Sequence, residues 1–210
     1  MNRRLLIKVC GMRDLVNLKE IAALAPDYLG FIFVPATPRY VTLESRAELL
    51  QSVPATIRTV GVFRNVDLES VEDAARRYRL SAVQLHGEED SLYISECKKR
   101  IPSCQIFKAI NVSESGDELV NPPKGADLYI FDGLNPGSGE SFNWEQLGRY
   151  KQDVPFFLAG GVGPENIAQI NSSAQKHRML FGVDVNSKVE IKPGLKSPEL
   201  VKRVFEQGII

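Results

Sequence analysis

Eight short apolar runs, separated by longer segments of mixed polarity, place the strongest constraint on the fold of this chain. Most of the runs are apolar on successive residues rather than on alternate ones, which is typical of parallel strands covered on both faces. The expected strands span residues 5–10, 28–34, 57–63, 81–86, 105–110, 128–132, 155–160 and 179–185. The chain is therefore expected to build one parallel sheet.

The segments between these runs carry the signals of helices. Asp14 and Asp67 each precede an amphipathic segment, in the position where an aspartate caps a helix N-terminus. Pro164 and Pro198 stand where the first turn of a helix accepts proline. The exception is 111–126, where two prolines and two glycines leave room for one poor helix or only a loop.

Eight strand–helix units in 210 residues predict an α/β fold, a single (β/α)8 TIM barrel spanning 1–210 with a fifth helix that is degenerate or replaced by a loop. A doubly wound open sheet remains the alternative, because periodicity does not distinguish a closed sheet from an open one. The first strand is not followed by GxGxxG, and GxxxxGK[ST] occurs nowhere, which counts against the nucleotide-binding versions of that sheet.

Charge and composition narrow the class of partner. Lys and Arg together number 26, as do Asp and Glu, so no global field attracts nucleic acid or an anionic membrane. No apolar stretch approaches the roughly 18 residues of a membrane span, and we expect a cytoplasmic protein. Three cysteines without CxxC spacing and two histidines predict neither a disulfide framework nor a metal site. No apolar helix stripe predicts an oligomer.

Chemically active side chains gather where the expected strands end. In a (β/α)8 barrel the active site lies at the C-terminal ends of the strands, so these residues should meet on one rim. The candidates are Cys10, Arg39, Gln84, His86, Asp132, Gly160, Gly161, Asp184, Asn186 and Ser187. Their convergence is stronger evidence for a site than any one of them.

Two neighbouring loops predict a phosphate site. Gly160 and Gly161 lie in "LAGGVGPENI", a glycine-rich turn that leads into a helix and exposes backbone N–H groups to an anion. Asn186 and Ser187 lie in "VDVNSKVE", which adds amides and a hydroxyl. The simpler alternative is that the glycines only form a tight turn.

Each titratable candidate also has a structural interpretation. Cys10 is a possible nucleophile or base, but free cysteine is often just a small buried hydrophobe. Asp132 would be costly to bury unpaired, although it would also suit a cap on the amides of its own loop. The planar fork of Arg39 suits a carboxylate, whereas most arginines in polar loops simply face solvent. His86 and Gln84 would equally serve as barrel filling.

Taken together, these segments resemble a known family along nearly the whole chain. The shared segments are "KVCGM", "LGFIFVPATPRYV", "VGVF", "AVQLHGEE", "GSGESFNW", "LAGGVGPENI" and "GVDVNSKVE". In this order they resemble the phosphoribosylanthranilate isomerases, (β/α)8 enzymes of tryptophan biosynthesis. The resemblance implies an Amadori rearrangement of N-(5-phosphoribosyl)anthranilate to 1-(2-carboxyphenylamino)-1-deoxyribulose 5-phosphate, with no metal or organic cofactor.

The resemblance also implies roles for the candidate residues. Asp132 matches the general acid that opens the ribose ring, and Cys10 matches the general base that removes the C2′ proton. Arg39 would bind the anthranilate carboxylate, and the 5′-phosphate would lie on the loops of Gly160, Gly161, Asn186 and Ser187. Gln84, His86 and Asp184 match positions that line the site.

One departure from the family concerns the last strand, where "DVNSKVE" replaces the usual "DVSSGVE". If position 188 requires positive φ, Lys188 costs on the order of 1 kcal/mol; alternatively, its ammonium reaches the phosphate. The loop 133–141 is short and is expected to close over a ligand.

Three other functions are weighed against the isomerase. A non-catalytic phosphosugar-binding barrel is disfavoured by the presence of both Cys10 and Asp132. A histidine-pathway isomerase would carry aspartate in place of Cys10. A ribulose-phosphate epimerase-like barrel would require metal-binding histidines.

Overall fold

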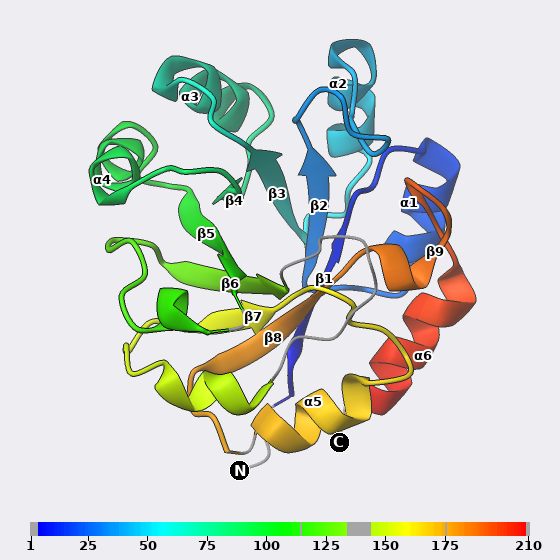
Figure 1. The fold of residues 1–210 in the computed structure, drawn as a ribbon. Coiled ribbons are helices and arrows are strands. Elements are labelled where there is room, and N and C mark those ends of the chain that lie inside the picture. Colours follow the sequence, from blue (N-terminus) through cyan, green and yellow to red (C-terminus); the bar gives the residue numbers. More distant parts are fainter. Residues whose placement is uncertain (1–3, 114, 134–143, 175, 209–210) are drawn as a thin grey trace.

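The computed structural model describes residues 4–113, 115–133, 144–174 and 176–208. Eight parallel strands form a closed barrel in sequence order, with the last strand paired to the first (Figure 1). The strands are β1 (Leu6–Cys10), β2 (Tyr28–Ile32), β3 (Arg58–Phe63), β4 (Ala82–Leu85), β5 (Gln105–Val112), β6 (Leu128–Gly133), β7 (Phe156–Leu158) and β8 (Leu180–Val185). The predicted barrel is confirmed, the open-sheet alternative is wrong, and every strand end lies within two residues of its expected position.

The described residues form six α-helices, which surround the barrel (Figure 1). They are α1 (Leu15–Ala22), α2 (Leu43–Gln51), α3 (Leu68–Arg77), α4 (Ser91–Arg100), α5 (Ile167–Ala174) and α6 (Pro198–Gly208). Asp14 caps α1 and Asp67 caps α3, each carboxylate accepting a hydrogen bond of 2.8 Å from the backbone N–H three residues on. None of the helices in the described ranges has the length and apolar character needed to cross a membrane.

Pro198 begins α6 as expected, but the expectation for Pro164 is wrong. The fifth α-helix begins at Ile167, and residues 164–166 form a turn before it. The side chain of Asn166 explains the delay, because it accepts from the Gly163 N–H (3.0 Å) and donates to the Gly161 carbonyl (2.9 Å). These bonds hold the loop after β7 in place of a helical turn.

The segment 111–126 contains no α-helix among its described residues. Its first two residues extend β5, and only Asp117–Leu119 form a short 3₁₀ turn. Gly116 precedes that turn with φ of +66°. A left-handed residue and the following prolines explain why the fifth helix is degenerate, as the composition predicted. Between β6 and β7 the described chain forms another 3₁₀ segment, Trp144–Arg149.

The barrel interior changes character along its axis. Its apolar part is a cluster of Tyr28, Val60, Ala82, Phe107, Ala109, Leu128, Ile130, Phe157 and Ala159. Towards the C-terminal ends of the strands the buried side chains become polar or charged: Lys8, Gln84, Asp132 and Asp184. Because burying charge without a partner is costly, these groups must pair with one another or serve a site.

A small antiparallel ribbon, β9 (Glu190–Lys192) and β10 (Leu195–Lys196), lies between β8 and α6. It was not predicted, because its strands of three and two residues are too short for a periodic signal. The ribbon brings the buried side chains of Glu190 and Lys196 to the C-terminal end of the barrel. Asn17 of α1 fixes its position through two hydrogen bonds of 2.8 Å to the backbone of Lys196.

The buried ion pair of Glu89 and Lys108 gives a test of how this barrel tolerates unpaired charge. Glu89 accepts from Lys108 Nζ (3.1 Å) and from the N–H groups of Asn65 (2.7 Å) and Gly87 (2.8 Å). Glu89→Ala is expected to lower the free energy of unfolding by about 3–5 kcal/mol in urea denaturation, because Lys108 stays buried without its partner. Loss of the exposed cap in Asp67→Ala should cost only about 1 kcal/mol, and equal losses in the two variants would contradict the interpretation.

Candidate active site

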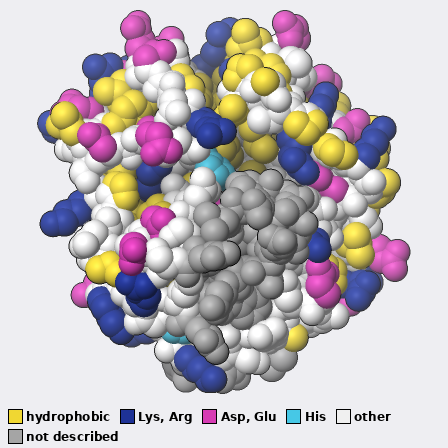
Figure 2. All heavy atoms as spheres, in the orientation of Figure 1, with side chains coloured by type: hydrophobic (Ala, Val, Ile, Leu, Met, Phe, Trp, Pro, Cys, Tyr) yellow, Lys and Arg dark blue, Asp and Glu magenta, His cyan; other side chains and the backbone are white. Residues whose placement is uncertain are grey.

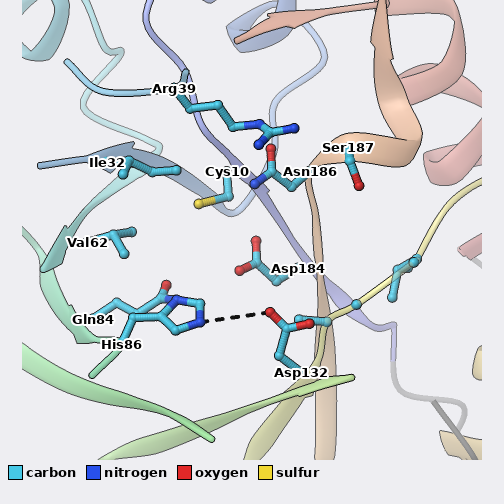
Figure 3. Close-up of a pocket in the computed structure, with 14 residues that line it drawn as sticks. Cys10, Ile32, Arg39, Val62, Gln84, His86, Asp132, Asp184, Asn186 and Ser187 are labelled. Atoms are coloured by element: carbon cyan, nitrogen blue, oxygen red, sulfur yellow. Dashed lines mark hydrogen bonds and ion pairs between the residues drawn. The ribbon is translucent and has the colours of Figure 1, made fainter. Parts of the chain in front are cut away.

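A pocket opens at the C-terminal end of the barrel, and all ten residues predicted from the sequence line it (Figure 3). Its lining consists of Cys10, Ile32, Arg39, Val62, Gln84, His86, Asp132, Ala159, Gly160, Gly161, Val162, Asp184, Asn186 and Ser187. They meet because parallel strands in a barrel all end on the same side. Acidic and basic side chains are interspersed on the described part of this face (Figure 2), in keeping with a net charge of zero.

Cys10 lies at the end of β1 with only 5% of its surface exposed. Burial raises the pKa of its thiol, and Asp184 raises it further, while the ammonium groups of Lys8 and Lys196 oppose the rise. The balance leaves the pKa above its ordinary value, so the resting side chain is a thiol.

Directly below this thiol is a charged pair that the sequence interpretation missed. Lys8 is fully buried on β1, and its Nζ lies 2.6 Å from Oδ2 of Asp184. Burial alone would lower the pKa of Lys8, but Asp184 and Cys10 outweigh it, so the pKa is raised and the ammonium persists. The available signal was a lysine inside an apolar run, two residues before Cys10 and therefore on the same face of the strand.

Asp132 lies one residue before the end of β6, and Asp184 lies between it and Cys10 (Figure 3). Burial and the neighbouring Asp184 carboxylate raise its pKa to about 6. Gly160 makes its position possible: φ is +73°, and a Cβ there would lie 2.6 Å from Oδ1 of Asp132. A side chain at position 160 would therefore displace the carboxyl group.

His86 faces Asp132 as a neutral base. Burial, followed by the nearby cations Lys8, Lys108 and Arg64, lowers the pKa of its imidazole to about 4. Its Nε2 lies 3.9 Å from Oδ2 of Asp132, which is too long for a hydrogen bond, and a neutral ring makes no ion pair. The amide of Gln84 contacts Nδ1 at 3.2 Å, so with Gln84 donating, the ring proton lies on Nε2 and points towards Asp132.

Arg39 reaches the pocket with its guanidinium already bound to the chain's own Glu190. Nε lies 2.9 Å from Oε1 and Nη2 lies 2.6 Å from Oε2 of Glu190. Lys196 donates to the same Oε1 (2.7 Å) and to Oδ1 of Asn186 (2.6 Å). Sequence reasoning found Arg39 but missed Glu190 and Lys196, whose ribbon it did not predict.

The expected phosphate loops lie side by side in the pocket wall. Gly160 and Gly161 both have positive φ, of +73° and +71°, which glycine adopts without strain. Asn186 is present in the pocket, but its side-chain oxygen accepts from Lys196. Ser187 lines the same pocket as Gly160 and Gly161 (Figure 3).

Lys188 follows these residues without backbone strain. It lies in a 3₁₀ turn, Ser187–Val189, and is not among the described residues with positive φ, so the condition for strain at this position is not met. Its Nζ lies 3.6 Å from Oε1 of Glu165, which belongs to the loop after β7. The expected closing loop, 133–141, lies outside the described residues from 134 onward.

The fold and site define a (β/α)8 barrel whose pocket holds a carboxyl group and a thiol beside two loops, one of them rich in glycine. The family described as N-(5'phosphoribosyl)anthranilate (PRA) isomerase matches residues 7–207. The N-(5'-phosphoribosyl)anthranilate isomerase of Parabacteroides distasonis is 36% identical, covering 97% of this chain and 93% of that protein. The chain therefore belongs to the phosphoribosylanthranilate isomerase family, and it converts phosphoribosylanthranilate to carboxyphenylaminodeoxyribulose phosphate in tryptophan biosynthesis.

Solved structures agree with this assignment. The phosphoribosyl anthranilate isomerase of Thermus thermophilus superposes with a TM-score of 0.83 at 28% identity, covering 97% of this chain and 98% of that one. A phosphoribosyl anthranilate isomerase in complex with reduced 1-(o-carboxyphenylamino)-1-deoxyribulose 5-phosphate has a TM-score of 0.79 at 30% identity, covering 97% and 98%. The family assignment counts against the histidine-pathway isomerase and the epimerase-like barrel.

The raised pKa of Asp132 predicts a stability effect that depends on pH. The folded state keeps this proton up to about pH 6, while the unfolded chain loses it near the ordinary value of 3.8, so folding becomes less favourable as pH rises through this window. Asp132→Asn is expected to be more stable than the parent by about 2–3 kcal/mol at pH 8 and nearly equal at pH 4.

Urea denaturation of both proteins at the two pH values measures this difference. His86 titrates in both proteins and cancels in the comparison. A stability difference that is the same at pH 4 and pH 8 would show that the carboxyl group is not destabilised by its burial.

Proposed function

We propose that Asp132 and Cys10 are the general acid and general base of this isomerisation. The observation that carries the proposal is their placement in one pocket, the carboxyl on β6 and the thiol on β1, with Asp184 between them (Figure 3). The two groups have environments suited to opposite roles. Asp132 holds a proton closer to neutral pH than an ordinary carboxyl, and Cys10 lies beside buried cations.

Ring opening requires the acid. Asp132 donates its proton to the furanose ring oxygen while the bond between C1′ and that oxygen breaks. The lone pair of the anthranilate nitrogen then forms the C1′=N bond of a protonated Schiff base. The neutral His86 next to Asp132 supports this role, because an imidazolium there would favour loss of the carboxyl proton.

Proton abstraction at C2′ requires the base. The thiolate of Cys10 removes the C2′ proton, and the electrons of that bond form C1′=C2′ while the C1′=N electrons return to nitrogen. The resulting enolamine becomes the ketone when C1′ gains a proton and the C2′ hydroxyl loses one. Every proton is thus moved by side chains or solvent.

The remaining pocket residues bind the two anionic ends of the substrate. Arg39 receives the anthranilate carboxylate, and the loops of Gly160, Gly161, Asn186 and Ser187 hold the 5′-phosphate. Gln84, His86 and Asp184 contact the ribose between them. A cytoplasmic location, with a phosphosugar as the partner and no nucleic acid or membrane, fits a step of tryptophan biosynthesis.

The acid and base roles predict the behaviour of two variants that each remove one titrating group. Cys10→Ala and Asp132→Asn are each expected to lower kcat by about 10²–10⁴-fold, with near-normal circular dichroism. The measurement follows loss of anthranilate-glycoside fluorescence from freshly generated phosphoribosylanthranilate. If the parent protein binds this substrate but leaves it unchanged, the non-catalytic phosphosugar-binding alternative holds instead.

The phosphate loops predict a binding effect without a chemical one. Ser187→Ala is expected to raise KM by about 10-fold with little change in kcat, because a hydrogen bond to a charged group is lost equally in ground and transition states. Inhibition by inorganic phosphate should weaken in the same ratio. A fall in kcat at unchanged KM would remove Ser187 from the phosphate site.

A further inference from the structure

We propose that Lys8 is a positioning residue whose buried ammonium holds the Cys10 sulfur in its thiolate form during catalysis, and that Gly30 exists to let the two groups meet. The inference rests on the proposed role of Cys10 as the base. Lys8 does not line the substrate pocket but lies one layer below it. It therefore acts through Cys10 rather than on the substrate.

The geometry of two neighbouring strands brings these groups together. Lys8 and Cys10 are two residues apart on β1 and so project from the same face. Gly30 of β2 pairs with Cys10 in the sheet register. A Cβ at position 30 would lie 2.8 Å from Cys10 Sγ and 3.2 Å from Lys8 Nζ. The sulfur and the ammonium thus flank one point that only glycine leaves empty.

Lys8 has donor capacity to spare for the sulfur. An ammonium has three N–H donors, and among the described residues Asp184 accepts one of them at 2.6 Å. The other cations near Cys10 are committed elsewhere: Arg39 to Glu190 (2.6 Å), and Lys196 to Glu190 (2.7 Å) and Asn186 (2.6 Å). Lys8 is thus the cation best placed to stabilise a negative sulfur.

The charges that face Cys10 come from four parts of the fold. Lys8 on β1, Asp184 on β8, Lys196 on the ribbon and Arg39 in the loop after β2 act on Cys10, and Glu190 of the ribbon pairs with both Arg39 and Lys196. With Cys10 as a thiol, these three cations and two carboxylates leave one positive charge in excess; a thiolate balances it. Asp132, beyond Asp184, is neutral while it holds its proton, and His86 is neutral.

A purely structural role for Lys8 makes a different prediction. If the pair with Asp184 only fills the barrel, its loss would lower stability without changing the titration of the sulfur. Reactivity of Cys10 towards iodoacetamide separates the two cases, because the thiolate is the reacting form. Mass spectrometry of the Cys10 peptide distinguishes it from Cys97 and Cys104.

The experiment measures Cys10 alkylation and kcat from pH 6 to 11.5 in the parent, Lys8→Met and Gly30→Ala. In Lys8→Met the pH midpoint of Cys10 alkylation should rise by about 1 unit or more, since a close opposite charge is lost. The apparent pKa of the basic limb of the pH profile of kcat should rise by a similar amount. Gly30→Ala should shift both upward by less. Lys108→Met, which removes another buried barrel lysine, is the matched control and should leave the Cys10 midpoint unchanged.

The outcomes separate the two levels of the proposal. A folded Lys8→Met protein with an unchanged alkylation midpoint overturns the inference. A shifted midpoint with an unmoved kinetic limb supports the action of Lys8 on the sulfur and overturns Cys10 as the base. Should Lys8→Met fail to fold, Gly30→Ala decides, because an unchanged midpoint there also overturns the inference.

Discussion

The burial of charge at one end of the barrel is the constraint on which this structure depends. Lys8, Asp184, Glu190 and Lys196 are almost completely removed from solvent, and each has an oppositely charged partner within 2.7 Å. Replacing such pairs with apolar side chains is often neutral or stabilising, so they are weak evidence for stability as such. Their concentration around one thiol and one carboxyl instead indicates a site whose electrostatics are built before substrate arrives.

This arrangement divides the barrel into two halves with different purposes. The half of the interior away from the C-terminal ends of the strands is an aromatic and aliphatic cluster. In it, Tyr28, Phe107 and Phe157 contact one another edge to face or at a tilt. The half of the interior at the C-terminal ends of the strands buries polar groups instead, among them Gln84 and Asp132. Each of these two side chains has an oxygen that lacks a hydrogen-bond partner among the described residues. Such unsatisfied oxygens destabilise the free enzyme and are available to a ligand that can donate to them.

Much of the architecture could be predicted from the sequence. The continuous apolar runs located every strand of the barrel, because a parallel sheet covered on both faces leaves that signal. The grouping of the pocket residues could then be predicted too, since the C-terminal ends of the strands in a barrel all lie on one side. Their chemistry was harder to separate from structural filling: for Cys10 and Asp132 it was the family resemblance that supplied the roles.

What could not be predicted depends on contacts between distant segments. Nothing near Arg39 in the chain indicates that its partner is Glu190, 151 residues away. The backbone conformation of Lys188, a 3₁₀ turn without positive φ, and the nearby Glu165 depend on how two loops meet, which the sequence does not indicate. Pro164 was placed in a helix because the competing hydrogen bonds of the Asn166 side chain have no reliable sequence signature.

The ribbon between β8 and α6 has a consequence for how this pocket can evolve. Glu190 clamps Arg39 in a bidentate grip, so the guanidinium is oriented beforehand and loses little rotational freedom when a substrate binds. The orientation is set by a hairpin that belongs to no barrel strand. Changes in that hairpin can therefore redirect the arginine and alter the shape and charge of the pocket, while the barrel strands keep their sequence.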